Sequence, residues 1–305
     1  MKKMLNEVIL NYIKRRECKL KSSTIARYSN LYLNHIEKYF NKISIQGLNN
    51  QDLQNYVDSL IKKQISPIVI KEAIVLIKLS LRIEAKLGKY RMPFIDLDIP
   101  STEKKNHVQT LTRFEEKLLI NYILNNQRQK YSGIILSLLT GMRIGEICAL
   151  KWSDIDLKKR HIKVCKTLQR ICFKNKSSRI EIGTTKTQSG SRIIPISNIL
   201  YDFLLSIKPL NRETYFLTCQ HTAKEPRNYR KVFNTLIKKL KLRSVTFHSL
   251  RHTFATRLIE NKIDIKTISE LLGHSSTNIT ISIYVHSEFS TKKKAIKSLD
   301  KLILN

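Results

Sequence analysis

Six residues in the second half of the chain have side chains suited to phosphoryl transfer: Arg143, Lys186, His248, Arg251, His274 and Tyr284. His248 and Arg251 are three apart in a segment with helical spacing, so both face one site. A guanidinium group can donate two parallel hydrogen bonds to two phosphate oxygens, so Arg143 and Arg251 are suited to hold a transferring phosphate. Cations already in place when charge develops usually supply the largest catalytic effect. These residues therefore predict phosphate chemistry that needs no metal ion.

Tyr284 is the candidate nucleophile, because a phenol can form a covalent link that outlives one reaction step. Clustered cations lower the phenol pKa from its ordinary value of about 10. His248 is placed to take the phenolic proton as a general base. His274 follows Gly273 at the end of an apolar run and can donate a further hydrogen bond to a phosphate oxygen. No Gly-rich nucleotide-binding loop occurs in the sequence, so no ATP is expected.

Five stretches carry these residues in a fixed order: TGMRIGEICALKWSDID, TTKTQSGSRIIPI, FHSLRHTFAT, LLGHSS and ISIYVH. Together, with His274 and Tyr284 ten residues apart, they resemble the tyrosine recombinases of the phage integrase type, in particular the two-domain, Xer-like site-specific integrases. The resemblance is strong from Thr110 to about Ser287 and looser over the N-terminal part. One departure is Ser249, where the family often has an acidic residue. That change removes no reacting group.

The resemblance implies a mechanism and a fold. Tyr284 would attack DNA and leave a 3′-phosphotyrosine and a free 5′-hydroxyl. Lys186, in a turn between strands, would protonate the leaving oxygen, and Glu146 would support Arg143. The fold would be mainly α with a small antiparallel β-sheet: an N-terminal helical bundle of the SAM-like, core-binding kind and a C-terminal α+β DNA breaking-rejoining catalytic domain. Neither a cofactor nor a metal ion is implied.

Each of these residues also has a simpler interpretation. Arg143 could clamp a DNA phosphate without catalysing anything, and Glu146 could be a charge that favours a helix start. Lys186 competes with three other lysines nearby, and a lone lysine in a turn is usually solvated. His252, beside Arg251, is expected to pack or cap. Of twelve tyrosines, Tyr284 is chosen for its spacing from His274.

Composition indicates a polyanionic partner. The chain has 305 residues with 56 Lys and Arg against 24 Asp and Glu, a net charge of +32. DNA, RNA and anionic membrane all fit such a surface.

No run approaches 18 apolar residues, and polar residues interrupt the N-terminal segment, so neither a membrane span nor a signal peptide is expected. Five cysteines without a C-x-x-C pair predict reduced thiols. We expect a bacterial protein, cytoplasmic and associated with the nucleoid.

Apolar periodicity divides the chain into residues 1–100, a helical core-DNA-binding domain, a linker at 101–109, and the catalytic domain at 110–305. In the first part, helices are expected over residues 4–16, 22–40, 50–61 and 66–86. The stretch from 160 to 195 alternates β-branched residues and predicts one antiparallel sheet of two or three strands. Further helices are expected at 113–124, 131–139, 144–150, 201–207, 229–240, 247–261 and 265–272, near 279, and at the C-terminus.

The resemblance also implies partners. They are double-stranded DNA with inverted-repeat core sites, further copies of the chain in a synaptic tetramer, and in some systems accessory DNA-bending proteins. Helical periodicity begins at Leu5, so we expect no separate module for remote arm sites. A last helix over 290–305 has an apolar stripe and would dock on a neighbouring protomer or on its own domain. Two other functions stay open: a type IB topoisomerase and a DNA-binding regulator without catalysis.

Overall fold

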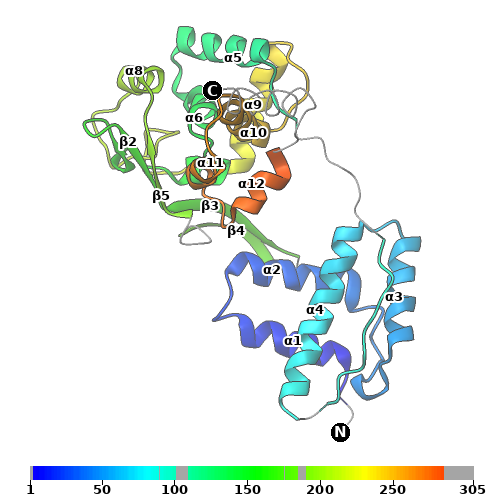
Figure 1. Cartoon of the computed structure of the whole chain (residues 1–305). Coiled ribbons are helices and arrows are strands. Elements are labelled where there is room, and N and C mark those ends of the chain that lie inside the picture. The colour runs from blue at the N-terminus through cyan, green and yellow to red at the C-terminus, as the bar shows by residue number, and fades with distance from the viewer. Residues whose placement is uncertain (1–2, 89, 101–108, 175, 185–189, 285–305) are drawn as a thin grey trace, which may run out of the picture. The chain divides into compact units, whose positions relative to one another are not determined.

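The structure, a computed structural model, describes residues 3–88, 90–100, 109–174, 176–184 and 190–284, with only the backbone at 176, 279 and 282–284. It is mainly helical with small β-sheets, as predicted (Figure 1). The chain forms two compact units, Met1–Asn106 with Arg170–Arg179, and His107–Gln169 with Ile180–Asn305. The predicted division at residues 101–109 stays a prediction, because 101–108 lie outside the described residues.

The first unit is a helical bundle. Its described elements are α1 (Leu5–Arg16), α2 (Ser22–Leu31), the π-helical turn η1 (Tyr32–Ile36), the 3-10 turn η2 (Ile45–Gly47), α3 (Asn50–Lys62) and α4 (Pro67–Lys86). The predicted single α-helix over 22–40 is wrong in its second half. There Glu37 donates its backbone N–H to the Tyr32 carbonyl five residues back, and this wider turn keeps Tyr32 and Ile36 in the core.

The bundle is held by α4, which contacts α1, α2 and α3 (Figure 1). Ser66 caps α4 and Pro67 fills its first turn, as the sequence indicates. Residues 170–179 add to this unit in a way that no local pattern predicts. Phe173 packs against the bundle core. The Asn30 side chain donates to the Cys172 carbonyl at 2.8 Å and accepts from the Lys174 backbone N–H at 2.8 Å.

The helices of the second unit surround α6, which is buried along almost its whole length. The described elements are α5 (Arg113–Asn126), η3 (Gln129–Tyr131), α6 (Ser132–Thr140), α7 (Ile144–Ala149), η4 (Trp152–Asp154), α8 (Asn198–Ser206), α9 (Pro226–Lys239), α10 (Phe247–Glu260), α11 (Ile265–Leu272) and α12 (Thr277–Tyr284). α6 contacts α5, α7, α8 and α10. α8 and α9 begin three residues earlier than predicted, because Ser197 caps one and Pro226 starts the other.

The strands in the described part of the second half form two sheets, where the sequence predicts one. They are β1 (Ile155–Asp156), β2 (His161–Val164), β3 (Lys166–Phe173), β4 (Lys176–Thr184) and β5 (Arg192–Pro195). β1, β2 and β5 make an antiparallel sheet in which Ile162 lies opposite Ile155 and Ile194. β3 and β4 pair with each other. β1 is not predicted because two residues are too few to show alternation.

Gly141 ends α6, and its backbone conformation sets the direction of the chain that leads to Arg143. Its φ of +66° lies in the left-handed region, and an added Cβ would come within 2.5 Å of Phe254 Cδ1 and 2.9 Å of Leu272 Cδ2. We expect Gly141→Ala to lower the free energy of unfolding by about 2–5 kcal/mol, the sum of left-handed strain and overpacking. Denaturant unfolding measures this change.

Gly88→Ala is the matched control for Gly141→Ala. Gly88 has a similar φ of +68°, but no atom lies within 4 Å of its added Cβ. This variant should lose only the backbone contribution, about 1–2 kcal/mol. Equal losses in the two variants would show that the packing around Gly141 is not as tight as described.

Candidate active site

Arg143 lies directly before α7, at the point where the chain leaves Gly141. Its backbone N–H donates to Glu146 Oε2 at 2.9 Å and its Nη1 donates to Glu146 Oε1 at 2.9 Å. Glu146 is the third residue of α7, so its carboxylate caps the helix start and holds the arginine at once. The Arg143 side chain is 38% exposed, whereas Glu146 is 3% exposed. The guanidinium group is thus anchored at its base and open to one side.

α10 brings His248 and Arg251 to the same place. Arg251 is 1% exposed, and it donates to the carbonyls of Gly141 at 2.8 Å and Leu272 at 2.7 Å. His248, one turn earlier, is exposed to the cavity that it lines with Arg143 and Arg251. The His252 ring stands edge-on to the His248 ring with centroids 4.5 Å apart. His252 therefore supports His248 from the side.

The end of α11 completes the cluster. Gly273 ends this helix in the left-handed conformation, with φ +64°. Arg143 donates to the Leu272 carbonyl at 3.3 Å and to the Gly273 carbonyl at 3.2 Å. The carbonyls at a helix C-terminus carry partial negative charge, which favours these cations. His274 follows, and its Nδ1 lies 2.8 Å from Thr280 Oγ1 of α12.

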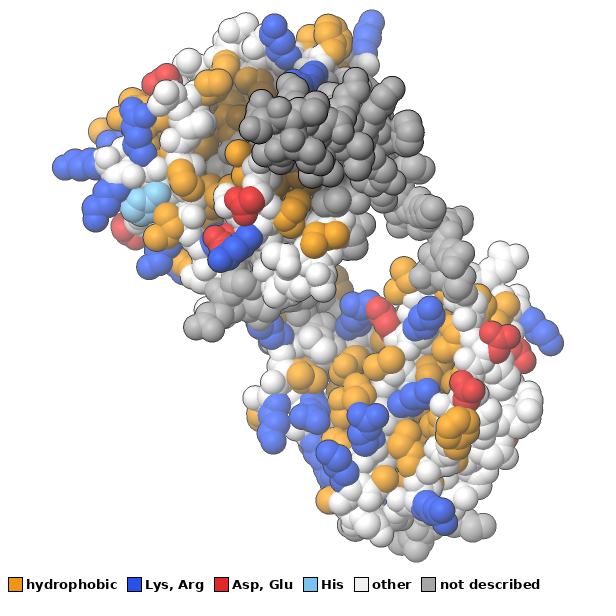
Figure 2. Space-filling model, in the orientation of Figure 1, with side chains coloured by type: hydrophobic (Ala, Val, Ile, Leu, Met, Phe, Trp, Pro, Cys, Tyr) orange, Lys and Arg blue, Asp and Glu red, His pale blue; other side chains and the backbone are white. Residues whose placement is uncertain are grey.

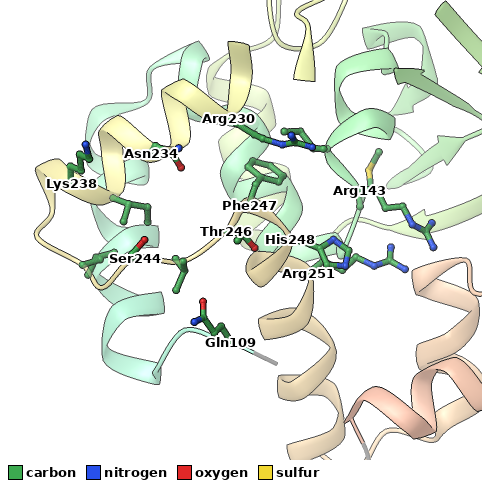
Figure 3. Close-up of a pocket in the computed structure, with 15 residues that line it drawn as sticks. Gln109, Arg143, Arg230, Asn234, Lys238, Ser244, Thr246, Phe247, His248 and Arg251 are labelled. Carbon is green, nitrogen blue, oxygen red and sulfur yellow. The ribbon is translucent and has the colours of Figure 1, made fainter. Parts of the chain in front are cut away.

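A cavity of about 1000 Å³ opens over this cluster (Figure 3). Figure 3 shows Arg143, His248 and Arg251 close together at one end, and Arg230, Asn234 and Lys238 of α9 along another wall. Among the described residues that line the cavity, four are Arg or Lys and none is Asp or Glu. Such a cavity is suited to a phosphate group of a polyanion.

Burial, together with the charges of the cluster, lowers the pKa of its histidines and keeps them neutral. Burial and the charges of Arg251 and Arg143 lower the pKa of His274 to about 4. The same three causes lower the pKa of His248 below 6.5. Burial, His248 and Arg251 lower the pKa of His252 to about 4. At pH 7 His248 can therefore accept a proton, and His274 holds a hydrogen bond as a neutral ring.

The pKa of Glu146 is set by opposing effects. Burial would raise the pKa, but the hydrogen bond and charge of Arg192 and the charge of Arg143 together lower it below the usual value. Glu146 is therefore ionised at pH 7 in spite of its burial. One buried carboxylate thus serves two arginines.

These depressed histidine pKa values predict how stability depends on pH. In the unfolded chain a histidine takes up its proton near pH 6.5, whereas folded His252 and His274 do so only near pH 4. The free energy of unfolding should therefore fall as the pH drops from 6.5 towards 4, by at most about 1.4 kcal/mol per pH unit for each histidine. We expect His252→Gln to flatten this dependence, measured by denaturant unfolding at several pH values. His221→Gln, at an exposed position, is the control, and an unchanged slope in His252→Gln would contradict the assignment.

Two residues predicted for the site are only partly described or not described at all. Lys186 lies outside the described residues. Tyr284 is the last residue of α12, a helix that packs against α10 and α11, and only its backbone is described. The predicted roles of Arg143, Lys186, His248, Arg251, His274, Tyr284 and Glu146 stay predictions. The predicted docking helix over 290–305 also lies outside the described residues.

Arg192, the first residue of β5, belongs to this cluster and was not predicted. Its side chain is 6% exposed and pairs with Glu146. A weak signal exists in the sequence, since Arg192 and buried Ile194 alternate and so share one face of a strand.

Within the described ranges no group of three or more His, Cys, Asp or Glu residues could hold a metal ion. None of the described helices has the length and apolar character of a membrane span.

The fold and the site define a class of protein whose arginine and histidine side chains are suited to hold a phosphate of a polyanion. Two family models match the chain. The model described as the phage integrase family matches residues 109–291. The model described as the phage integrase N-terminal SAM-like domain matches residues 4–61. The chain therefore belongs to the phage integrase family: it is a tyrosine-type site-specific recombinase, an enzyme that acts on DNA and transfers its strands.

Curated relatives and solved structures agree with this family. A tyrosine recombinase XerC-like protein of Caldanaerobacter subterraneus subsp. tengcongensis is 28% identical over 93% of this chain and 79% of its own length. A tyrosine recombinase of Agathobacter rectalis is 30% identical over 84% of each chain. The structure of the Tn1549 transposon integrase with a circular intermediate DNA superimposes with a TM-score of 0.79 at 22% identity, covering 97% of this chain and 99% of that one. At that identity, the structural likeness shows the fold alone.

Proposed function

We propose that this recombinase integrates or excises a mobile element, or resolves a replicon, by strand exchange through a 3′-phosphotyrosine on Tyr284. The observation that carries the proposal is the cavity lined by Arg143, His248 and Arg251, with no acidic residue among its described lining. Such a lining attracts an anion, and a phosphate diester of DNA is one. Tyr284 ends α12, which packs on α10, the helix of Arg251, and on α11, the helix that precedes His274.

Each residue of the site then has a role in the reaction. Arg143 and Arg251 stabilise the charge on the nonbridging phosphate oxygens, and His274 adds a hydrogen bond. His248 takes the proton of Tyr284 as the phenolate attacks phosphorus. The bond to the 5′ oxygen breaks, and Lys186 gives that oxygen its proton. Because the phosphotyrosine retains the bond energy, rejoining by a 5′-hydroxyl needs no ATP.

The proposed substrate is duplex DNA with two inverted core sites, bound by copies of this chain that assemble into a synaptic tetramer. Relatives support the part of this proposal that concerns DNA with paired sites. One solved structure is a lambda integrase dimer bound to a core site, and another is XerH bound to a palindromic substrate in a post-cleavage complex. In this proposal accessory DNA-bending proteins assist at some sites, and the working compartment is the bacterial cytoplasm at the nucleoid.

The test is capture of a covalent protein–DNA adduct. The purified full chain is incubated with a library of random duplexes, each nicked so that the short fragment bearing the released 5′-hydroxyl diffuses away. Adducts that survive detergent are recovered, and the attached DNA is sequenced. We expect one enriched sequence with inverted symmetry, and a tryptic peptide containing Tyr284 that carries the DNA. Binding without any adduct would support a DNA-binding regulator instead.

The salt dependence of DNA binding follows from the net charge of +32. Figure 2 shows Lys and Arg side chains spread over the visible face of the first unit among exposed hydrophobic ones. If about 6–10 phosphates are contacted, log K should fall with log salt with a slope of about −5 to −9. Fluorescence anisotropy between about 50 and 200 mM salt measures the slope. A slope near −1 would mean that about one phosphate is neutralised, and it would contradict binding through many phosphate contacts.

A further inference from the structure

Arg192 and Glu146 form a buried ion pair beside the cavity. Arg192 Nη1 donates to Glu146 Oε1 at 3.1 Å, and Nη2 donates to Oε2 at 2.9 Å. The two side chains are 6% and 3% exposed. Burying two charges is costly and is tolerated only where hydrogen bonds satisfy both groups. This pair joins β5 to α7 across 46 residues of sequence.

The hydrogen bonds of Glu146 are divided equally between two arginines. A carboxylate has about four acceptor positions. Arg192 occupies two of them, and the backbone N–H and Nη1 of Arg143 occupy the other two, at 2.9 Å each. With every position filled, the carboxylate has one orientation. The orientation of the Arg143 guanidinium group is therefore set in part by Arg192, which does not itself line the cavity.

The same two arginines also hold consecutive carbonyls at the end of α11. Arg192 Nε donates to the Leu271 carbonyl at 2.6 Å, and Arg143 donates to those of Leu272 and Gly273. Arg192 Nη1 donates further to the Gly190 carbonyl at 3.2 Å. The start of α7, the start of β5 and the end of α11 are thus joined by one hydrogen-bond network next to His274.

We infer that Arg192 is a positioning residue for DNA cleavage: it holds Glu146 so that the Arg143 guanidinium group faces the phosphate. The inference rests on the proposed function of the cavity. Without Arg192, two acceptor positions of buried Glu146 are empty and the nearest cation is Arg143. Its guanidinium group is then drawn towards Glu146 and away from the phosphate. The loss of a partner that orients a reacting group typically costs about 10- to 100-fold in activity.

The first test measures adduct formation on the nicked duplex recovered with the wild-type chain. Arg192→Met should slow the adduct rate about 10- to 100-fold, with DNA affinity within about 3-fold because phosphate contacts elsewhere supply most of it. Arg192→Lys keeps the positive charge, so this variant should fold. A lysine cannot donate two parallel hydrogen bonds to the two Glu146 oxygens, so adduct formation should still be slow. Arg212→Met is the control, since Arg212 also binds backbone carbonyls, those of Trp152 and Ile155, but away from the cavity.

A double-mutant cycle separates positioning from a general loss of structure. If Arg192 acts through Arg143, Arg192→Met should cost about 10- to 100-fold in the wild-type background and less than about 3-fold in the Arg143→Lys background. Equal factors in the two backgrounds would overturn the inference, because a purely structural role lowers both rates alike. Melting temperatures of all variants identify any that fail to fold.

A measurement without DNA keeps this inference separate from the proposed function. In ¹⁵N NMR of the free protein, the Arg143 guanidinium group should rotate slowly in the wild-type chain. In Arg192→Met and Arg192→Lys it should rotate faster, or its ¹⁵N chemical shift should change. An unchanged Arg143 signal would overturn the inference even if cleavage is slow. If the wild-type chain forms no adduct with any DNA, the proposed function fails, and the NMR result alone decides whether Arg192 positions Arg143.

Discussion

Tyr284→Phe is expected to abolish the covalent protein–DNA adduct, with a loss of at least about 10⁴-fold, while DNA affinity stays within about 2-fold. The reason is that the substitution removes one oxygen, the atom that would bond to phosphorus, and leaves the ring and all cations in place. The measurement is denaturing gel electrophoresis of the chain with the nicked duplex, alongside a gel shift for binding.

Tyr201→Phe is the matched control for Tyr284→Phe. Tyr201 lies in α8, where its ring packs under the Arg160 guanidinium group with 4.2 Å between the charged carbon and the ring centroid. That contact needs only the ring, so the adduct should form at the wild-type rate. An adduct that persists in Tyr284→Phe would assign the nucleophile to another residue, and peptide mapping of the adduct would identify it.

Arg143→Ala is expected to slow adduct formation by about 10³-fold and to change DNA affinity by less than about 3-fold. Arg143 has a partly exposed guanidinium group at the cavity, where the charge on the phosphate grows in the transition state. Affinity, by contrast, is shared among many basic residues that contact phosphates. Single-turnover cleavage and anisotropy titrations on the same duplex measure the two effects.

The control for Arg143→Ala is Arg160→Ala, an exposed arginine outside the cavity whose Nη1 donates to Asn198. It should cleave at the wild-type rate. Arg251→Ala is a less clean test, because Arg251 is 1% exposed whereas the Arg143 side chain is 38% exposed. That variant should lose cleavage and also melt at a lower temperature. Equal losses of affinity and cleavage in Arg143→Ala would mean that Arg143 only binds DNA.

The helices and most of the candidate site could be predicted from sequence because their signals are local. Apolar spacing, Pro67 and Ser66 mark α4, and three-residue spacing places His248 and Arg251 on one face of α10. The motifs around these residues also identified the family, which the comparisons confirm. The π-helical turn at Tyr32–Ile36 could not be predicted, since its apolar spacing is also that of an α-helix.

Only the tertiary structure decided which charges share a partner. The sequence by itself determined that Arg143, His248, Arg251 and His274 occur in segments typical of a phosphate site. It did not determine that Arg192 fills half of the acceptor positions of Glu146, or that residues 170–179 add to the first unit. Such contacts join residues 46 or more apart. Those of Glu146 form because a buried carboxylate must find hydrogen-bond partners wherever the fold brings them. The need of a buried group for a distant hydrogen-bond partner leaves no periodic pattern in the sequence, so it could not be predicted from the sequence.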